Sequence, residues 1–352
     1  MRAAVLRENN QIDVENVEEK PLKHNEVRVK VRAAGICGSD IHKMQTRWKY
    51  PLPAVMGHEF AGEICEIGDN VDHLKLGDRV AGIPFLPCYS CEYCQKGNYS
   101  LCENYEMIGS HYHGGFAETV VLPKNNVVSI GDLSFEEGAM IEPLAVAMHG
   151  VQGIEPKLGD SVVVFGIGTI GILVVQALLV AGVKSVIAVD ISDDKLKEAK
   201  SFGAEFTINS LKENLEEKVK EYTNGAGADI AMECAGSKIT QEQCLRIVAK
   251  QGKIGYLGIA YQDVLLPEKS FENIFRREYT IKGFWNSYSA PFPGREWTNG
   301  IEFVKQGKIR LKELISHRIP LEETKAAFDM VVNRKETFSK VMIKPSEIKE
   351  EN

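Results

Sequence analysis

Four of the chain's eight cysteines stand within sixteen residues, in the stretch PCYSCEYCQKGNYSLC. Their spacing is C-x2-C-x2-C-x7-C, and the positions are Cys88, Cys91, Cys94 and Cys102. Tetrahedral Zn²⁺ takes four thiolates at about 2.3 Å, and short loops between ligands let one small lobe supply all of them. Four protein ligands leave no position for water or substrate, so this pattern predicts a structural zinc site.

Other sites can be built from the same cysteines. A redox pair uses C-x-x-C, but that motif opens a helix in a thioredoxin-like fold and does not need four cysteines. An iron–sulfur cluster accepts similarly close spacings. The N-terminal segment MRAAVLRENNQIDVENVEEK has no continuous apolar region, so it does not resemble a secretory signal. We therefore expect a cytoplasmic protein, where stable disulfides are rare, and we favour zinc over the two alternatives.

A second set of residues that could bind a metal or transfer a proton is spread over the motifs CGSDIH, GHE and EPLAVAMH. It comprises Cys37, Ser39, Asp40, His42, His58, Glu59, Glu142 and His149. A catalytic zinc takes three protein ligands and leaves a fourth position open. One cysteine, one histidine and one glutamate would serve, but their spacing does not show that they converge. A single buried cysteine or histidine more often belongs to a hydrophobic core.

A glycine motif follows the strand-like run SVVVF and precedes an apolar helix-like run. The residues that fit G-x-G-x-x-G and its intervening pair are Gly166, Gly168, Thr169, Ile170 and Gly171. In a dinucleotide-binding turn the first glycine permits a tight bend and the second lets the backbone approach a pyrophosphate. The third lets helix and strand pack closely, and the helix N-terminus faces the anion.

An acidic residue, Asp190, ends the next strand-like run, SVIAVD. In this position a carboxylate hydrogen-bonds the adenosine ribose hydroxyls and repels a 2′-phosphate. The following residues, Ile191 and Ser192, supply no arginine that would attract one. The pattern therefore favours NAD over NADP. The alternative is a structural glycine turn with a surface aspartate.

The surrounding elements change character along the chain. Residues 1–150 carry alternating strand patterns such as EVRVKVRAAG, with turn glycines and prolines. From Asp160 strands and helices alternate, which predicts a parallel sheet with helices on both faces. The alternation stops near Gly283. We expect one domain from residues 1–150 and 286–352, and a nucleotide-binding domain from residues 151–285.

Composition limits the partners that the chain can have. It has 352 residues, 44% of them hydrophobic, and a formal net charge of -7, which argues against nucleic acid as a partner. The uncharged run Ser161–Val183 is long enough to cross a bilayer. It divides better into a strand and a helix joined by glycines, so we do not expect a membrane protein.

The motifs CGSD and GHE, the four-cysteine lobe, GGFAE and the glycine motif occur in the order seen in zinc-dependent medium-chain alcohol and polyol dehydrogenases. The resemblance extends over essentially the whole chain. It implies an α/β protein with a GroES-like β-barrel catalytic domain and a doubly wound Rossmann domain. It also implies an NAD-dependent oxidoreductase with two zinc ions per chain, which associates as a homodimer or homotetramer through its Rossmann sheets.

The same resemblance assigns the scattered residues. Cys37, His58 and Glu142 match the catalytic zinc ligands, and the cysteine lobe matches the structural zinc site. Glu59 matches a residue that lies near the metal and can approach it when substrate is absent. His42 matches the relay histidine of many alcohol dehydrogenases.

The implied mechanism gives roles to the neighbours of these ligands. We expect Ser39 to accept the proton of the substrate hydroxyl, which then passes through the nicotinamide ribose toward His42 and solvent. The substrate carbon gives hydride to the nicotinamide. Asp40 is expected to orient His58 from behind the metal.

The stretch FWNSYSAPFPGREW, which generic alcohol dehydrogenases lack, resembles members that act on a polyol phosphate. Such a substrate needs cations or hydrogen-bond donors at its phosphate end. The candidates are Arg47, Lys49, Asn286, Ser287 and Tyr288. An unphosphorylated polyol, a diol or threonine is the alternative substrate. A zinc-lobed adaptor protein is a different class, against which the acidic charge and the dinucleotide motif both speak.

Overall fold

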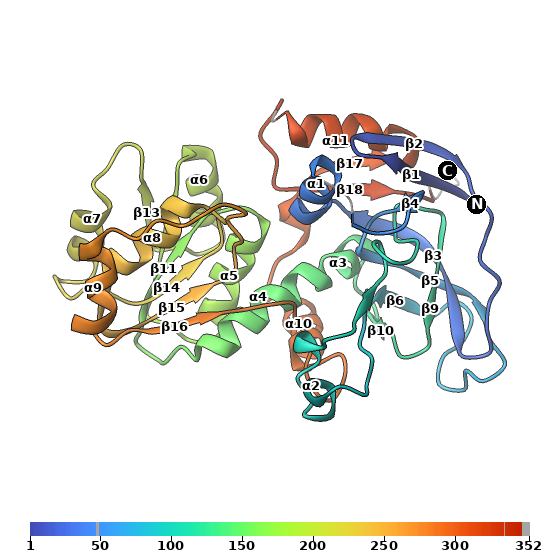
Figure 1. Ribbon diagram of the computed structural model, residues 1–352, viewed down its shortest axis with the longest axis horizontal. Helices are drawn as coiled ribbons and strands as arrows, with labels where there is room; N and C mark the ends of the chain where they lie inside the picture. The colour runs from blue at the N-terminus through green and yellow to red at the C-terminus, as the bar shows by residue number, and fades with distance from the viewer. Residues whose placement is uncertain (47–48, 334, 347–352) are drawn as a thin grey trace. The chain divides into compact units, whose positions relative to one another are not determined.

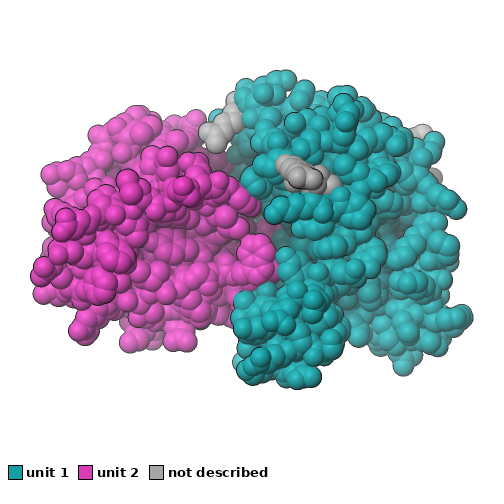
Figure 2. Space-filling model, viewed as in Figure 1, with its two compact units in different colours: residues 1–142, 288–305, 310–352 teal, residues 143–287, 306–309 magenta. Residues whose placement is uncertain are grey.

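The structure is a computed structural model that describes residues 1–46, 49–333 and 335–346 (Figure 1). Its internal contacts divide the chain into two units, coloured separately in Figure 2. Unit 1 comprises Met1–Glu142, Tyr288–Lys305 and Arg310–Asn352, and unit 2 comprises Pro143–Ser287 and Gln306–Ile309. Arg47, one of the candidate phosphate-binding residues, lies outside the described residues.

Unit 1 is built on a mainly antiparallel sheet. Its strands are β3 (Glu26–Gly35), β5 (Glu59–Ile67), β6 (Arg79–Gly82), β9 (Thr119–Pro123), β10 (Val127–Ser129), β17 (Ile315–Pro320) and β18 (Lys340–Lys344). The spatial order is β10-β6-β5-β3-β18-β17, and β9 also pairs with β3. The last strand, β18, runs antiparallel to β3 with Met342 opposite Gly35. The C-terminal segment therefore completes a sheet that the N-terminal segment begins.

The remaining strands of unit 1 form two smaller sheets, with orders β2-β1-β4 and β7-β8. Their bounds are β1 (Arg2–Glu8), β2 (Gln11–Asn16), β4 (Ala54–Val55), β7 (Phe85–Leu86) and β8 (Glu106–Met107). The helices are α1 (Gly38–Gln45), α2 (Glu92–Gln95), α3 (Phe135–Ala139), α10 (Arg295–Lys305), α11 (Thr324–Val332) and the short 3₁₀ turns η1 (Tyr99–Leu101), η2 (Lys312–Leu314) and η3 (Leu321–Glu323). A shared core joins these parts, since Leu6, Val29 and Phe328 belong to one buried cluster.

Unit 2 is built on a parallel sheet. Its strands are β11 (Ser161–Phe165), β12 (Ser185–Asp190), β13 (Phe206–Asn209), β14 (Ala228–Glu233), β15 (Val248–Tyr256) and β16 (Thr280–Gly283). The spatial order is β13-β12-β11-β14-β15-β16, and all neighbours are parallel. Counted from β11, this is the order 3-2-1-4-5-6 of a dinucleotide-binding fold, whose ligand crevice lies where the order reverses, between β11 and β14. The predicted parallel sheet is confirmed.

Helices connect the strands of unit 2 and pack on them (Figure 1). They are α4 (Ile141–Ile154), which begins in unit 1, and α5 (Thr169–Val180), α6 (Asp193–Ser201), α7 (Leu215–Tyr222), α8 (Lys238–Ile247) and α9 (Glu268–Arg276). The uncharged run in the sequence is shared between β11, which is wholly buried, and α5, whose residues from Gly171 to Leu178 are buried. No helix among the described residues is both long and apolar enough to cross a membrane.

Candidate metal and coenzyme sites

The four clustered cysteines come together in space. Their sulfur atoms all lie within 4.8 Å of one another, and Cys88 Sγ is 4.0 Å from Cys94 Sγ. A tetrahedron with 2.3 Å metal–sulfur bonds separates neighbouring sulfurs by about 3.8 Å, whereas a disulfide bond requires about 2.05 Å. The arrangement therefore fits a closed four-thiolate zinc site.

Backbone groups of the lobe point at these sulfurs. The N–H of Cys91 donates to Cys88 Sγ at 3.4 Å, and the N–H of Cys88 donates to Cys102 Sγ at 3.3 Å. Hydrogen bonds from Ser90, and then from Cys91, lower the pKa of Cys88 to about 5. This favours the thiolate, which is the form that binds metal. Burial instead raises the pKa of Cys94 to about 12.

A second group of possible ligands forms where β3 ends and β5 begins. These strands are antiparallel, with Gly35 opposite Glu59. The C-terminal end of β3 therefore lies beside the N-terminal end of β5. This brings Cys37, just after β3, close to His58 and Glu59. One ligand atom from each of these three side chains lies within 4.8 Å of the others. Residues 21 positions apart thus reach one point because of strand pairing, which their spacing alone could not reveal.

Asp40 lies behind this group and is fully buried. Its Oδ2 accepts the N–H of Cys37 at 3.0 Å, which caps α1. Its Oδ1 lies 3.2 Å from His58 Nδ1, at ion-pair distance, although the alignment falls short of a good hydrogen bond. Burial alone would raise the pKa of Asp40, but the facing His58 lowers it. This contact leaves His58 Nε2 for a metal, as the carboxylate partners of metal-bound histidines do.

Glu142 stands in the first turn of α4 and is 7% exposed. Its carboxylate is not among the three groups that approach within 4.8 Å of one another. Burial raises the pKa of Glu142 to about 7, while His58 lowers it and Glu59 raises it further. The charge of Glu142 therefore interacts with those of the site residues. The structure groups Glu59, rather than Glu142, with the predicted ligands Cys37 and His58.

The composition of this cluster suits a metal cation. Burial would lower the pKa of His58, yet Asp40 and Cys37 raise it well above its usual value. One buried ammonium is present, since Lys340 Nζ lies 2.6 Å from Glu59 Oε2. The soft thiolate, the imidazole and the carboxylates are the donor set of a catalytic zinc site. The residues therefore fit zinc.

Lys340 was not among the residues singled out from the sequence. It begins β18, where KVMIKP is recognisable only as a strand, and its ammonium also donates to the carbonyl of Ile36 at 3.1 Å. A lysine is almost never fully buried unless it is paired. The only available signal was a lysine leading an apolar strand, and no motif links it to Glu59.

Ser39 and His42 follow Cys37 on α1. Ser39 Oγ donates to Cys37 Sγ at 3.3 Å, so its hydroxyl lies beside the candidate metal site. His42 is half-buried, about one helical turn further along. The structure thus brings Ser39 to the expected ligand and keeps His42 on the same short helix.

The described candidate phosphate-binding residues differ in their exposure. Lys49 is exposed, and Asn286 is half-buried with a left-handed backbone (φ 55°). Tyr288 is 1% exposed, and its ring stacks on Phe85 with centroids 4.5 Å apart. Its backbone N–H and carbonyl both bond the hydroxyl of Ser100, in the cysteine lobe.

Part of FWNSYSAPFPGREW is buried. Tyr288 also stacks on Phe292 and Trp297, and Ser287 is completely buried. Tyr288 therefore packs against the lobe through its ring and its backbone. A substrate role for Ser287 and Tyr288 therefore stays a prediction, and their burial is the feature that residue types alone did not reveal.

The glycine motif adopts the geometry that close approach requires. Gly166 has φ 82°, and a Cβ at this position would lie 2.6 Å from Ala235. A Cβ on Gly171 would collide with the carbonyl oxygen of Gly166. Gly168 caps α5, and a Cβ there would meet nothing within 4 Å, so the helix N-terminus is open to a ligand. Thr169 begins that helix.

Ile170 and Asp190 complete the expected coenzyme site. Ile170 is the second residue of α5, and Asp190 ends β12. Asp190 Oδ2 accepts the N–H of Ile167 at 2.7 Å, and Oδ1 accepts the N–H groups of Ile191 and Ser192. The carboxylate thus holds the glycine turn beside the edge of the sheet where a ribose would bind.

Comparison with known proteins identifies the family. Residues 23–132 match the alcohol dehydrogenase GroES-like domain, and residues 169–306 match the zinc-binding dehydrogenase domain. Galactitol 1-phosphate 5-dehydrogenase of Escherichia coli K12 is 40% identical over 302 residues, which cover 84% of this chain and 86% of that protein. The chain belongs to the zinc-dependent alcohol and polyol dehydrogenase family. This dehydrogenase is also 33% identical to sorbitol dehydrogenase of Bacillus subtilis 168, over 98% of each chain.

Solved structures agree with this placement of the dehydrogenase. Galactitol-1-phosphate dehydrogenase from Escherichia coli superimposes with a TM-score of 0.93 at 36% identity, covering 98% of this chain and all of the other. A protein described as a zinc-binding dehydrogenase from Sinorhizobium meliloti 1021, bound to NADP, superimposes with a TM-score of 0.90 at 32% identity, covering 98% and 99%. The predicted fold class and the zinc and NAD(P) cofactors are confirmed, and the adaptor alternative is set aside.

Proposed function

We propose that this dehydrogenase oxidises a secondary hydroxyl of a polyol phosphate, namely galactitol 1-phosphate to tagatose 6-phosphate, with NAD as the hydride acceptor. The observation that carries the proposal is the convergence of Cys37, His58 and Glu59. The buried carboxylate of Glu142 interacts electrostatically with His58 and Glu59, whose charges shift its pKa. The named activity of the 40% identical relative supports the substrate. Asp190, in the ribose position and without a neighbouring arginine, supports NAD.

Each residue at the site has a proposed role. Cys37, His58 and Glu142 would hold the catalytic zinc, with Glu59 as the alternative carboxylate. The ion supplies a Lewis acid that makes the substrate hydroxyl more acidic. Ser39, 3.3 Å from the ligand sulfur, accepts the hydroxyl proton, and His42 passes it to solvent. Asp40 keeps His58 in the orientation that metal binding needs.

The second zinc and the oligomer belong to the same proposal. Cys88, Cys91, Cys94 and Cys102 hold a structural ion that stabilises their lobe. Strand β16 is the edge of the parallel sheet, and all of its residues are exposed. An exposed edge is a ready template for pairing, so we infer a homodimer formed edge to edge, or a homotetramer built from it.

An unphosphorylated polyol is the second candidate substrate. It is favoured by the similarity to a sorbitol dehydrogenase, which covers 98% of each chain. Both candidates use the same hydride chemistry. They differ only in whether unit 1 provides a binding group for a phosphate.

A substrate panel tests the proposal. Reduction of NAD and NADP is followed with galactitol 1-phosphate, galactitol, sorbitol, 2,3-butanediol and threonine, beside zinc analysis of the same preparation. We expect the highest kcat/KM with galactitol 1-phosphate and NAD, and about two zinc ions per chain. A higher kcat/KM with sorbitol than with galactitol 1-phosphate would overturn the substrate assignment. A content of one zinc ion per chain would mean that only one of the two proposed zinc sites exists.

A further inference from the structure

Lys43 shares a helix with the candidate catalytic site. Helix α1 starts directly after Cys37, and Lys43 follows Ser39 by four residues and Asp40 by three. Residues with these separations are neighbours on one side of a helix. Ser39 and Lys43 are therefore about 6 Å apart along the axis. A substrate whose reacting hydroxyl lies at Ser39 can extend along α1 toward Lys43.

The direct contacts of the Lys43 ammonium are a hydroxyl and a ring, and its charge also helps to lower the pKa of Asp40, after the larger effect of the facing His58. Lys43 Nζ donates to Ser110 Oγ at 2.8 Å and lies 5.8 Å from the centre of the Tyr50 ring. Among the residues that the structure describes, no carboxylate forms an ion pair with Lys43. Partly buried charges are normally paired, as Arg28 is with Glu66 at 2.6 Å. Lys43 is half-buried and forms no direct ion pair with Asp40, so its ammonium can still accept an anionic ligand.

Ser110 is held close to the metal site by the loop that carries it. It is 3% exposed. The preceding residue, Gly109, packs so tightly that a Cβ there would lie 2.8 Å from the carbonyl oxygen of Gly57, next to His58. Because Ser110 Oγ accepts a hydrogen from Lys43, its own hydroxyl hydrogen is free to be donated. The serine can therefore bond an anion at the same point as the lysine.

His111 supplies a third donor. Its Nδ1 accepts the N–H of Met107 at 3.1 Å, so the ring hydrogen lies on Nε2, which then acts as a donor. The ring packs edge-on against Tyr50, with centroids 4.7 Å apart, which restricts its orientation. Ser110 and His111 are consecutive, so the two donors come from one short segment.

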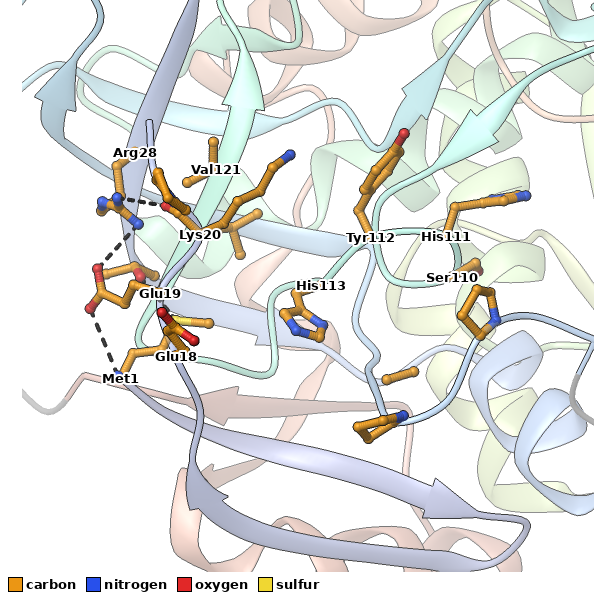
Figure 3. A pocket seen from close by; sticks show the side chains of 16 residues that line it. Met1, Glu18, Glu19, Lys20, Arg28, Ser110, His111, Tyr112, His113 and Val121 are labelled. Carbon is orange, nitrogen blue, oxygen red and sulfur yellow. Dashed lines mark hydrogen bonds and ion pairs between the residues drawn. The ribbon is translucent and has the colours of Figure 1, made fainter. Parts of the chain in front are cut away.

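The same two residues line a cavity of about 500 Å³ in unit 1 (Figure 3). Figure 3 shows them at one end of it, while Arg28, Glu19 and Met1 stand at the other. Charges at that far end neutralise one another, since Arg28 lies 3.1 Å from Glu19 and Met1 N lies 3.8 Å from the same carboxylate. Among the described residues that line the cavity, the acids are Glu18 and Glu19, which Figure 3 shows at the far end. The end formed by Ser110 and His111, which Lys43 reaches, presents donors, and the nearby Glu106 accepts the hydroxyl of Tyr112 at 2.7 Å.

We propose that Lys43, Ser110 and His111 form the subsite that binds the phosphate of the substrate. This inference rests on the proposed function, which it deepens by naming what distinguishes a polyol phosphate from a polyol. An ammonium, a hydroxyl and an imidazole N–H suit the acceptor oxygens of a phosphate. The subsite differs from the candidates suggested by sequence, of which Tyr288 is committed to packing.

The test compares two substrates in variants of the zinc-loaded enzyme. The readout is kcat/KM for galactitol 1-phosphate divided by kcat/KM for galactitol, with NAD. Lys43→Met should lower this ratio about 10- to 100-fold, the range that one charge-assisted hydrogen bond supplies, through KM for the phosphorylated substrate. Lys43→Arg should retain most of the ratio. Lys30→Met, at an exposed position on β3, is the matched control and should leave it unchanged.

Calorimetric titration of galactitol 1-phosphate into the NADH-bound holoenzyme gives an independent readout, with the same loss of affinity expected for Lys43→Met. If the wild type prefers the phosphorylated substrate and Lys43→Met keeps that preference, the subsite is wrong and the proposed function stands. An equal loss of kcat/KM with both substrates would mean that Lys43 has a structural role. A loss of the phosphate preference in Lys49→Met but not in Lys43→Met would show that the phosphate binds near Lys49 and would overturn the subsite. A wild type without any preference would overturn both.

Discussion

Lys340 donates to both carboxylate oxygens of Glu59, at 2.6 and 2.9 Å, and the two side chains are 4% and 1% exposed. The pair joins the last strand of the chain to the first residue of β5, beside Cys37 and His58. It holds a carboxylate at the edge of the candidate metal site and balances its charge. The C-terminal strand is thus part of the electrostatics of the site as well as of the sheet.

Breaking this pair from one side should be costly. Lys340→Met leaves the Glu59 carboxylate buried without a partner, so we expect a loss of about 3–5 kcal/mol in the free energy of unfolding. The double variant Lys340→Met with Glu59→Gln should recover most of the loss, because no uncompensated charge remains. Denaturant unfolding of the wild type, both single variants and the double variant measures the coupling. Additive effects of the two substitutions would contradict the role of the pair.

Zinc binding at the open site should depend on pH through Glu142. Burial raises the pKa of this carboxyl to about 7, so below that pH the ion must displace a proton. The affinity for the zinc ion of the open site should therefore fall as the pH is lowered from about 8 to about 6. This fall should be larger than the one expected if Glu142 had the ordinary pKa of a carboxyl group. Competition with a chelator at both pH values measures it. Glu142→Gln should bind zinc more weakly at both and with a flatter pH dependence; an unchanged slope would remove Glu142 from the ligand set.

Coenzyme choice should depend on the charge of Asp190. Asp190→Asn keeps an oxygen for the N–H of Ile167 but removes the charge that repels a 2′-phosphate. We expect the ratio of kcat/KM for NAD to that for NADP to fall by about 10- to 100-fold. Asp194→Asn, on the exposed start of α6, is the matched control and should not change the ratio. A wild-type preference for NADP would show that the carboxylate does not discriminate as argued.

Tyr288 should contribute to stability and not to substrate binding. Removing its ring in Tyr288→Ala empties a fully buried position between Phe85 and Trp297, which should destabilise unit 1 by about 3–5 kcal/mol. Tyr288→Phe preserves the stack and should leave KM for galactitol 1-phosphate unchanged. Thermal unfolding and steady-state kinetics separate the two effects. A raised KM in Tyr288→Phe with unchanged stability would restore its hydroxyl as a substrate contact.

Local motifs were sufficient where one short segment supplies a whole function. The lobe from Cys88 to Cys102 contains all of its own ligands. The glycine turn that starts at Gly166 contains its own helix N-terminus, and the acid at Asp190 lies one strand further on. In each case the geometry follows from backbone turns and adjacent elements, so residue types and their spacing predict it. The parallel sheet could be predicted for the same reason, because strands and helices alternate regularly.

Only the tertiary structure decided which distant residues meet. Strand pairing between β3 and β5 brings Cys37 to His58 and Glu59, and the return of β18 brings Lys340 to that carboxylate. The contact between Lys43 and Ser110 joins a helix to a loop 67 residues away. The order of residues along a chain sets local conformation, whereas the packing of a shared core sets such long-range contacts. For this protein, sequence alone therefore determined the class of chemistry, and the fold decided which side chains surround the reacting hydroxyl.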